Sequence, residues 1–413
     1  MKILFPEAYF TPENTASTYM EDNRFERFSK EGFQMVVFAP LPTRGVNKNV
    51  QKHYQKLAFE KMYNDAMIVY RFRLWSEGNN PLLRAIRYFF LCIKLFYKCV
   101  FSEDARSCDV MFVTSTPPII GISAGWIKKK VGIRIIYNLQ DIFPDSLVGT
   151  GLAKKGGLLW KIGRKIEDYT YRNADKIIVI SEDFKKNIMA KGVPEDKIVV
   201  IYNWVDENAV VDVPRSENGL FDKYGLERDK FYITYSGNIG LTQNLDLLLE
   251  VAEELDKEAP DIQFVIIGDG AYKQTLEKQV SEKHISNITF LPFQPYQDIS
   301  LVFSLGDVGL VISKPGVGAN SVPSKTWSIM SASRPVLANF DENELKMIIE
   351  ENNCGIFSKA GDKKAFKASI LQLYRDRALA VEMGQNGRHF ILENLTRDQG
   401  TQKYVDVIKS FER

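Results

Sequence analysis

The fold is decided by one segment in the second half of the chain, YITYSGNIGLTQN, which covers residues 232–244. A short apolar run of strand type is followed by Gly237 and Gly240, and then by a helical pattern over residues 245–259. Glycine lets backbone N–H groups approach a ligand closely, and a helix start adds unpaired N–H donors. We therefore expect a phosphate site here, although a simple turn into a helix capped by Asn or Thr explains the segment equally well.

Two further loops of the same half also follow apolar runs. The segment IIGDG, 266–270, ends an expected strand, and a plain turn into the helix at Tyr272 is an equally good interpretation. The segment SKPGVGANSVPSKT, 313–326, lies between an expected strand and a helix and carries two lysines, which are compact cations suited to diphosphate oxygens. Because three such loops follow strands of one lobe, we favour a ligand site over a solvated surface loop.

Short apolar runs alternate with amphipathic segments along the whole chain. This alternation predicts an α/β fold of parallel sheets with helices on both faces, which bind ligands at the carboxyl ends of their strands. The expected strands of the first half are 2–5, 35–40, 67–74, 110–114, 134–138, 176–181 and 198–202. Those of the second half are 232–236, 263–268, 288–292, 308–312, 336–339 and 355–358.

The chain is long enough for two domains, because its 413 residues exceed the roughly 250–300 at which single cores stop growing. The strand pattern restarts near Tyr232, after a charged stretch with little periodicity over 206–229. The expected divisions are a first domain at 1–205, a second at 206–390 and a C-terminal helix within 391–413 that crosses back to the first domain.

Composition argues against several classes of protein. A formal net charge of only +2 argues against a nucleic-acid partner. Four cysteines without a CxxC pair, and three scattered histidines, argue against a zinc site or a Ser-His-Asp hydrolase and suggest reduced thiols in the cytoplasm. The N-terminal stretch MKILFPEAYF is broken at Pro6 and Glu7, so it resembles a buried strand more than a signal-peptide core.

The motifs, taken in order, resemble those of GT-B fold glycosyltransferases of family four, in particular the bacterial capsule and O-antigen transferases. The second half carries SGNIGLTQNLDLLLEVAEEL, FVIIGDG, ITFLPFQPYQDI, GDVGLVIS and VPSKTWSIMSASRPVLA. The first half matches more loosely, through PENTAS, NLQDIFPDS and NADKIIVIS.

The resemblance implies two Rossmann-like lobes with a cleft between them, the first binding the acceptor and the second a nucleotide sugar. It implies transfer of a hexosyl or N-acetylhexosaminyl group, with retention, from a UDP-sugar, or alternatively a GDP-sugar, to a polyprenyl-diphosphate-linked glycan. No other cofactor is expected, and no metal, because no Asp-x-Asp pair stands in a strand-end loop. A nucleotide-sugar epimerase or hydrolase of the same fold and a non-catalytic two-lobed binding protein remain alternatives.

The resemblance also suggests which residues bind the two substrates. The donor-side residues are Gly237, Asn238, Gly240, Asn244, Gly268, Phe293, Gln294, Lys314, Asn320, Ser321, Pro323, Ser324, Lys325 and Ser328, and the acceptor-side residues are Glu13, Asn14 and Thr15. The base would lie near Phe293 and Gln294. Asn320 and Ser328 replace the two glutamates that the family usually carries, and Gln243 and Asn244 replace an Arg and a Lys; Lys314 and Lys325 can supply the missing positive charge.

Asp141 is the candidate catalytic residue, because its loop stands where the family often has a catalytic His. Asp145 and Glu7, which also follow expected strands, are rivals. Asp141 can equally well cap the next helix, since in a front-face retaining reaction the leaving phosphate itself can accept the proton of the acceptor.

Two basic amphipathic segments suggest a membrane-surface partner. In residues 81–101, Arg84, Arg87, Lys94 and Lys98 fall on one stripe of an otherwise apolar helix. Such a helix is too charged to span a bilayer but suits an anionic surface, whereas a core helix with one basic edge is the alternative. Residues 154–172 place Lys154, Lys161, Arg164, Lys165 and Arg172 opposite Leu159, Ile162, Ile166 and Tyr169, and a solvated face fits this second segment as well. The expected location is the inner face of the cell membrane, peripherally bound.

Overall fold

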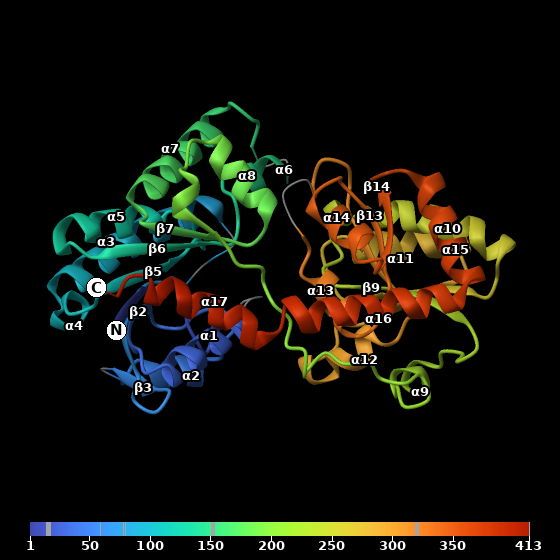
Figure 1. Cartoon of the computed structure of the whole chain (residues 1–413), viewed down its shortest axis with the longest axis horizontal. Coiled ribbons are helices and arrows are strands. Elements are labelled where there is room, and N and C mark those ends of the chain that lie inside the picture. Colours follow the sequence, from blue (N-terminus) through green and yellow to red (C-terminus); the bar gives the residue numbers. More distant parts are fainter. Residues whose placement is uncertain are drawn as a thin grey trace. The chain divides into compact units, whose positions relative to one another are not determined.

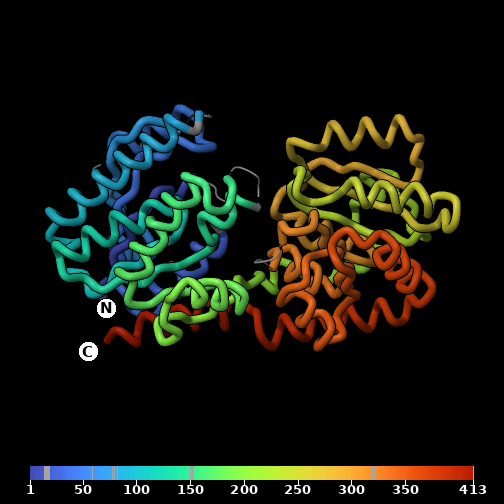
Figure 2. Tube along the Cα trace, turned by 90° about the horizontal axis from the view of Figure 1, so that it is seen from above, coloured from blue at the N-terminus to red at the C-terminus, as the bar shows by residue number. Residues whose placement is uncertain are grey.

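The computed structural model describes residues 1–13, 18–57, 59–76, 78, 80–149, 153–318 and 322–412. The chain folds into two compact units, whose paths can be followed in Figures 1 and 2. Unit 1 comprises Met1–Tyr202 and Gly400–Arg413, and unit 2 comprises Asn203–Gln399.

Unit 1 is built on an eight-stranded sheet of order β3-β4-β2-β1-β5-β6-β7-β8. All neighbouring strands are parallel except the edge pair β3 and β4. The strands are β1 Lys2–Pro6, β2 Gln34–Pro40, β3 Glu60–Met62, β4 Met67–Phe72, β5 Val110–Thr114, β6 Arg134–Leu139, β7 Lys176–Val179 and β8 Ile198–Val200. Only β3 was not expected, because three residues without apolar alternation carry no strand signal.

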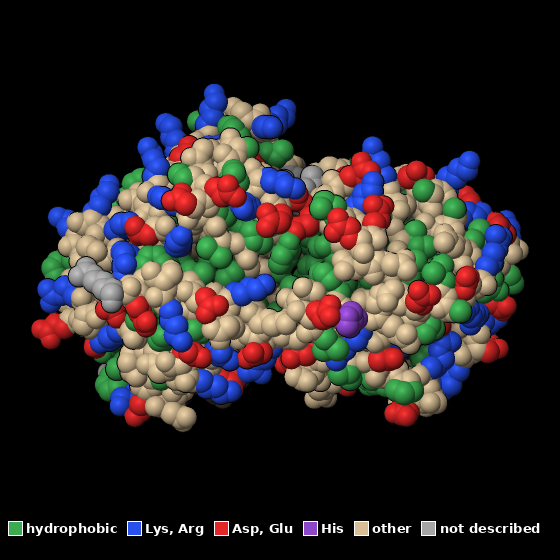
Figure 3. All heavy atoms as spheres, in the orientation of Figure 1, with side chains coloured by type: hydrophobic (Ala, Val, Ile, Leu, Met, Phe, Trp, Pro, Cys, Tyr) green, Lys and Arg blue, Asp and Glu red, His purple; other side chains and the backbone are tan. Residues whose placement is uncertain are grey.

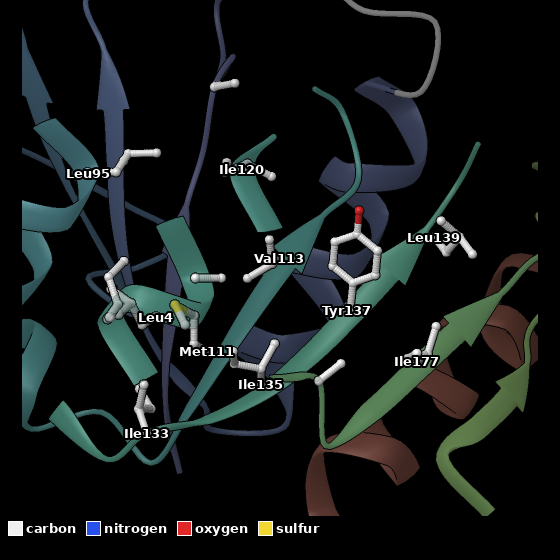
Figure 4. Close-up of a cluster of buried hydrophobic side chains, with 14 of the residues drawn as sticks. Leu4, Leu95, Met111, Val113, Ile120, Ile133, Ile135, Tyr137, Leu139 and Ile177 are labelled. Carbon is white, nitrogen blue, oxygen red and sulfur yellow. The ribbon is translucent and has the colours of Figure 1, made fainter. Parts of the chain in front are cut away.

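Helices cover both faces of this sheet. They are α1 Thr18–Lys30, α2 Lys48–Tyr54, α3 Pro81–Phe101, α4 Glu103–Arg106, α5 Ile120–Val131, α6 Asp145–Gly149, α7 Leu158–Asn173, α8 Glu182–Ala190 and the 3₁₀ turn η1 Glu195–Lys197. On one face, Leu95 of α3 and Ile120 of α5 join a cluster with Met111 and Val113 of β5 (Figure 4). On the other face, Phe5 packs edge-on against Phe25 of α1, with ring centres 5.2 Å apart.

The end of the chain completes unit 1. From Gly400 onward, helix α17, Arg397–Lys409, lies beside α1 on the sheet (Figure 1). Tyr404 is buried against Phe112, and its hydroxyl donates to the Oδ1 atom of Asn138 at 3.1 Å. The last helix is therefore part of the core of unit 1 and also fixes a side chain near the end of β6.

Unit 2 has a six-stranded, fully parallel sheet of order β11-β10-β9-β12-β13-β14. Its strands are β9 Phe231–Ser236, β10 Ile262–Ile267, β11 Ile288–Leu291, β12 Val308–Ile312, β13 Val336–Phe340 and β14 Gly355–Lys359. Its helices are α9 Leu220–Tyr224, α10 Leu245–Glu258, α11 Lys273–Glu282, α12 Ile299–Phe303, α13 Lys325–Ser331, α14 Glu344–Glu351, α15 Lys363–Arg375 and α16 Arg377–Asn394, with 3₁₀ turns η2 Leu241–Gln243 and η3 Tyr296–Asp298.

Apolar contacts fix the helices of unit 2 on both faces of the sheet. Buried side chains of α10 and α15 form one cluster with those of β9, β10 and β12. On α13, Trp327 stacks on Phe390 of α16 with ring centres 6.3 Å apart. Gly309 is required beneath α13, because a Cβ atom there would lie 2.5 Å from the Ile329 side chain. This packing fixes the first residue of α13, Lys325, beside the end of β9.

The sequence prediction for α3 was wrong about which side faces outward. Arg87 is only 1% exposed, and its Nε donates to the carbonyl of Trp75 at 3.0 Å. Leu91 and Leu95 lie one and two turns further along the same side and bury in the core, so that side docks on the sheet. The outward side is largely apolar: Leu82 is 70% exposed and Phe89 50%.

Helix α7 departs from its prediction only in part, because Lys161 and Lys165 are exposed as expected but the first half of the apolar face is exposed too. Leu158, Leu159 and Ile162 are exposed large hydrophobic residues, although an apolar face containing two of them was expected to pack inward. Gly163 faces the interior instead, because a Cβ atom there would meet Pro144 at 2.6 Å. None of the helices in the described part of the chain combines the length and the hydrophobicity that a bilayer-spanning helix requires.

Candidate functional site

In unit 2, three loops gather at one edge of the sheet. The strands β10, β9 and β12 are neighbours and run parallel, so the residues that follow Ile267, Ser236 and Ile312 meet at their carboxyl ends. This edge is where parallel α/β sheets bind ligands. It carries the glycines and lysines that the sequence singled out.

The first two loops touch through their backbones. The φ angles of Gly237 and Gly268 are 142° and 141°, a region that favours glycine. A Cβ atom on Gly268 would lie 2.0 Å from the carbonyl oxygen of Gly237, and one on Gly270 would lie 2.2 Å from that of Ile239. Backbone hydrogen bonds join the loops, from Gly237 to Ile267 at 3.0 Å and from Ile239 to Asp269 at 2.8 Å. Only glycine allows the two loops to approach this closely. We call Gly237, Gly268 and Gly270, with the hydrogen bonds that join their loops, the glycine layer.

Lys325 brings a cation to the same layer. Its Nζ lies 3.0 Å from the position that a Cβ atom on Gly237 would occupy, and 3.7 Å from the ring centre of Tyr235. Burial lowers the pKa of Lys325 to about 7. The charged form is therefore costly without an anion, and a bound phosphate would stabilise it.

Sequence reasoning did not single out Tyr235 as a site residue. It sits in the middle of an apolar strand, where a buried aromatic residue is typical of a core. In the structure its ring faces the ammonium group, and its hydroxyl donates to the carbonyl of Asn238 at 2.6 Å. The only signal in the sequence is its position two residues before Gly237.

The third loop is held in place from two sides. The N–H of Lys314 donates to the carbonyl of Thr242 at 2.8 Å, which ties this loop to the turn after Gly240. The N–H groups of Gly316 and Gly318 donate to the carboxylate of Asp341 at 2.9 and 2.8 Å. The loop is therefore braced by residues at the end of β13. Asn320 and Ser321 lie outside the described residues.

Two buried hydroxyl groups flank this loop. Within the described part of the chain, the Oγ of Ser313 and the Oγ1 of Thr326 have no hydrogen-bond partner. Buried hydroxyl groups are normally paired, so both have unused hydrogen-bonding capacity beside the loop. Neither was among the residues expected from the sequence, although both lie in the quoted 313–326 segment. Pro323, Ser324 and Ser328 lie partly or fully exposed around the start of α13.

The remaining donor-side residues lie at the ends of β9 and β11. Asn238 is exposed, and Asn244 precedes α10 with a φ of 52° and makes no side-chain cap bond to that helix. Gly240 donates its N–H to Gln243 at 3.0 Å. Phe293 is largely exposed, but Gln294 is buried: its amide donates to Tyr224 at 2.8 Å. Gln294 therefore supports α9 directly.

In unit 1, Asp141 follows β6 and is exposed to solvent on one side. Partial burial raises its pKa and the nearby charge of Asp145 adds to this, while hydrogen bonds from Ser146 and the Ile142 N–H oppose it. It also lines a cavity of about 10 Å³ with Tyr137 and Glu167. A carboxylate with a raised pKa is a better proton acceptor, which suits a general base.

The two rivals of Asp141 lie in different surroundings. Asp145 accepts from Lys191 at 2.8 Å, and Lys191 also contacts the buried Glu167 at 3.0 Å. Desolvation would raise the pKa of Asp145, but its hydrogen bonds, chiefly from Lys191, hold it below the ordinary value. Asp145 thus belongs to an ion-pair network. The pKa of Glu7 is raised well above the ordinary value by burial and by the charge of Glu21, which Arg24 partly offsets.

Of the expected acceptor-side residues, only Glu13 lies within the described residues; Asn14 and Thr15 lie outside them. Glu13 is buried, and its Oε1 accepts from the N–H groups of Thr43 and Arg44 at 2.7 and 2.8 Å. Its charge therefore holds the loop that follows β2.

Comparison with known families matches both halves of the chain. The family described as "Glycosyltransferase Family 4" matches residues 25–209, and the family described as "Glycosyl transferases group 1" matches residues 217–390. The two matches meet close to the division between the units.

Individual proteins give the same result. A Pseudomonas aeruginosa protein named as a glycosyltransferase, WbjE, is 27% identical over 68% of this chain and 68% of its own length. An Escherichia coli (strain K12) protein named for colanic acid biosynthesis, WcaI, is 31% identical over 50% of this chain and 51% of its own. Among solved structures, Anabaena HepE in complex with UDP is similar over 99% of this chain and 100% of its own, with a TM-score of 0.74 and 14% identity. This likeness confirms the fold.

Proposed function

We propose that this chain, a family-four glycosyltransferase with the two domains of the GT-B fold, moves a sugar from a UDP-sugar to a lipid-linked glycan. The sugar is a hexosyl or N-acetylhexosaminyl group, and the product belongs to surface-polysaccharide synthesis such as that of capsule or O-antigen. WcaI, which is named for colanic acid biosynthesis, and WbjE, which is named as a glycosyltransferase, support this assignment.

One observation carries the donor assignment: the ammonium group of Lys325 lies 3.0 Å from the point where Gly237 lacks a side chain. A diphosphate needs a cation and a backbone that it can approach closely. The glycine layer supplies the close approach and Lys325 supplies the charge. The hydroxyl groups of Ser313 and Thr326 have unused hydrogen-bonding capacity beside it.

UDP is the preferred nucleotide in this proposal, and GDP is the alternative. Anabaena HepE, which shares the fold, has been solved with UDP and with UDP-glucose. The donor base would lie near Phe293, whose ring is exposed and free to stack, and near the backbone of Gln294. The diphosphate charge is offset by Lys325, so the proposed reaction needs no metal ion.

The proposed reaction breaks the bond between the anomeric carbon and the diphosphate and forms a bond to the acceptor oxygen on the same face. Positive charge develops on the sugar and negative charge on the leaving phosphate. Lys325 stabilises the leaving group. The acceptor proton passes to Asp141, whose raised pKa suits this role, or to the leaving phosphate oxygen.

The acceptor side is proposed to work at an anionic membrane surface, at the inner face of the cell membrane. The outward side of α3 presents large apolar residues, and Arg84 near its start and Lys98 near its end are also exposed. Helix α7 adds exposed Leu158, Leu159 and Ile162, and Figure 3 shows Lys and Arg side chains around it. Apolar residues interspersed with cations are typical of interfacial membrane contacts.

A panel of nucleotide sugars tests the function. The purified chain is incubated with UDP-, GDP- and CMP-sugars and a short-chain prenyl-diphosphate-linked monosaccharide, and the product is analysed by proton NMR. We expect acceptor-dependent transfer from UDP-sugars with retention of the anomeric configuration, which the coupling of the product's anomeric proton reports. Release of free sugar without acceptor would indicate a hydrolase, and thermal protection by a nucleotide without turnover would indicate a binding protein.

A further inference from the structure

A groove on the outer surface of unit 1 lies between α3 and α5 and plays no part in the donor site. Its volume is about 380 Å³, within the range of roughly 300–1,000 Å³ typical of ligand pockets. The lining residues are Ile93, Phe96, Tyr97, Trp126, Lys129 and Lys130. Its floor is aromatic, since Phe96 meets Trp126 edge-on with ring centres 6.3 Å apart.

The charged side chains that line this groove, Lys129 and Lys130, are both positive. Lys129 and Lys130 are exposed at the last turn of α5, and within the described residues neither forms an ion pair with a carboxylate; the Nζ of Lys129 lies 5.2 Å from the ring centre of Tyr169. Their neighbour Lys128 differs, because it pairs with Asp175 at 2.6 Å. Two uncompensated cations beside an apolar slot complement an anion that carries a hydrocarbon chain.

The groove lies at the opposite edge of the sheet of unit 1 from Asp141, the candidate catalytic residue. Helix α5 begins after the carboxyl end of β5 and ends before the amino end of β6, so Lys129 and Lys130 lie at the amino edge of the sheet. Asp141 follows the opposite, carboxyl end of β6. An occupant of the groove is therefore not the group that reacts. Tyr97, 57% exposed, lines the groove and is also part of the exposed apolar side of α3, so the two surfaces are continuous.

We propose that this groove holds one hydrocarbon chain of an anionic membrane phospholipid, with the lipid phosphate against Lys129 and Lys130. The proposal rests on the membrane association proposed above and adds to it a specific lipid site. The bound lipid anchors unit 1 and is not consumed.

The test uses the full chain and a short-chain phosphatidylglycerol with brominated acyl chains, kept below its micelle concentration. Bromine quenches tryptophan on contact, and Trp126 lines the groove. We expect saturable quenching that disappears in Trp126→Phe. Ile93→Trp, which fills the groove from a half-buried position, should abolish this signal at Trp126 while leaving flotation with vesicles intact.

Charge variants test the phosphate contact. Lys129→Gln with Lys130→Gln should weaken monomer binding at least fivefold. The matched control is Lys48→Gln with Lys52→Gln, two exposed lysines of α2, which should change nothing. Equal binding of the neutral short-chain phosphatidylcholine would overturn the charge assignment, and competition by glycerol 3-phosphate as strong as that of the lipid would overturn the chain assignment.

The remaining outcomes separate this inference from the proposed function. Vesicle binding without quenching by the monomeric lipid would contradict the lipid site in the groove but not the membrane association. If the chain shows neither vesicle binding nor quenching, both proposals are wrong. Displacement of the phosphatidylglycerol by farnesyl phosphate at a tenfold lower concentration would assign the groove to an isoprenoid lipid and contradict the proposal.

Discussion

The ammonium nitrogen of Lys325 lies 3.7 Å from the ring centre of Tyr235. A cation over an aromatic face is stabilised by the ring quadrupole, which partly replaces lost hydration. Within the described residues, no carboxylate pairs with Lys325, so its charge is not neutralised locally. The pair holds a cation at the glycine layer, ready for an anion.

The pH dependence of donor binding follows from the pKa of Lys325, about 7 in the free protein. A bound diphosphate favours the ammonium form and raises this pKa, so binding takes up a proton, and affinity falls as pH rises above 7. Between pH 6 and 8.5 we expect the affinity for UDP-glucose to fall roughly tenfold or more, with a slope approaching one decade per pH unit.

Calorimetry in buffers of different ionisation enthalpy measures both the affinity and the proton uptake. UDP-glucose is the right probe, because its diphosphate diester does not titrate in this range. The profile should flatten in Lys325→Met. A wild-type profile that is already flat would show that Lys325 does not meet the diphosphate.

Gly268→Ala should disrupt the glycine layer. The new Cβ atom would lie 2.0 Å from the Gly237 carbonyl oxygen, at a φ of 141°. We expect a loss of roughly 1–3 kcal/mol in unfolding free energy and loss of UDP binding. Gly316→Ala is the matched control: its φ of 81° is also unfavourable, but no atom lies within 4 Å of the added Cβ. Urea unfolding and UDP titration of both variants distinguish a clash from backbone strain alone.

Asp141→Asn should fold and bind UDP normally but lose most transfer to acceptor, because the amide cannot take a proton. Asp145→Asn is the comparison, since it weakens the contact with Lys191 at 2.8 Å. We expect this second variant to lose about 1.5–3 kcal/mol of stability, the usual range for hydrogen bonds to charged groups. Near-normal turnover of Asp141→Asn would leave proton transfer to the leaving phosphate or to Glu7.

Leu82→Glu with Phe89→Glu should release the protein from anionic vesicles. The two side chains lie seven residues apart on the outward side of α3 and are 70% and 50% exposed, so folding should be unaffected. We expect at least a tenfold loss in flotation with phosphatidylglycerol vesicles, and weaker wild-type binding as salt rises. Val381→Glu with Leu392→Glu, exposed on α16 of unit 2, is the control. Unchanged flotation of the α3 variant would contradict the proposed membrane contact.

Much of the fold could be predicted from hydrophobic periodicity. The expected strands at 110–114 and 308–312 have the observed bounds, and the parallel arrangement followed from the strand–helix alternation. Periodicity could not decide which side of α3 docks on the sheet. That depends on the carbonyl of Trp75, which satisfies a buried Arg87, and no local pattern reports such a partner.

The candidate site could be predicted only in outline. Glycines after strands and lysines near helix starts have recognisable spacing, so Gly237 and Lys325 could be proposed from the sequence, and the structure places them side by side. Tyr235 and Thr326 were missed, because a strand aromatic and a helix hydroxyl resemble ordinary core residues until the neighbouring loops are in place. The roles of Lys325 and Asp141 in binding and catalysis stay predictions until they are measured.

The most direct test of the central claim is the affinity of Lys325→Met for UDP-glucose, measured by titration calorimetry at pH 6.5. If the donor diphosphate lies against Lys325 and Gly237, the variant should bind about 1.5–3 kcal/mol more weakly than wild type, roughly 10- to 150-fold. Lys346→Met, which removes a half-buried lysine of α14 in the same unit that pairs with Glu342, should bind like wild type. Equal affinity of Lys325→Met and wild type would contradict the proposed donor site.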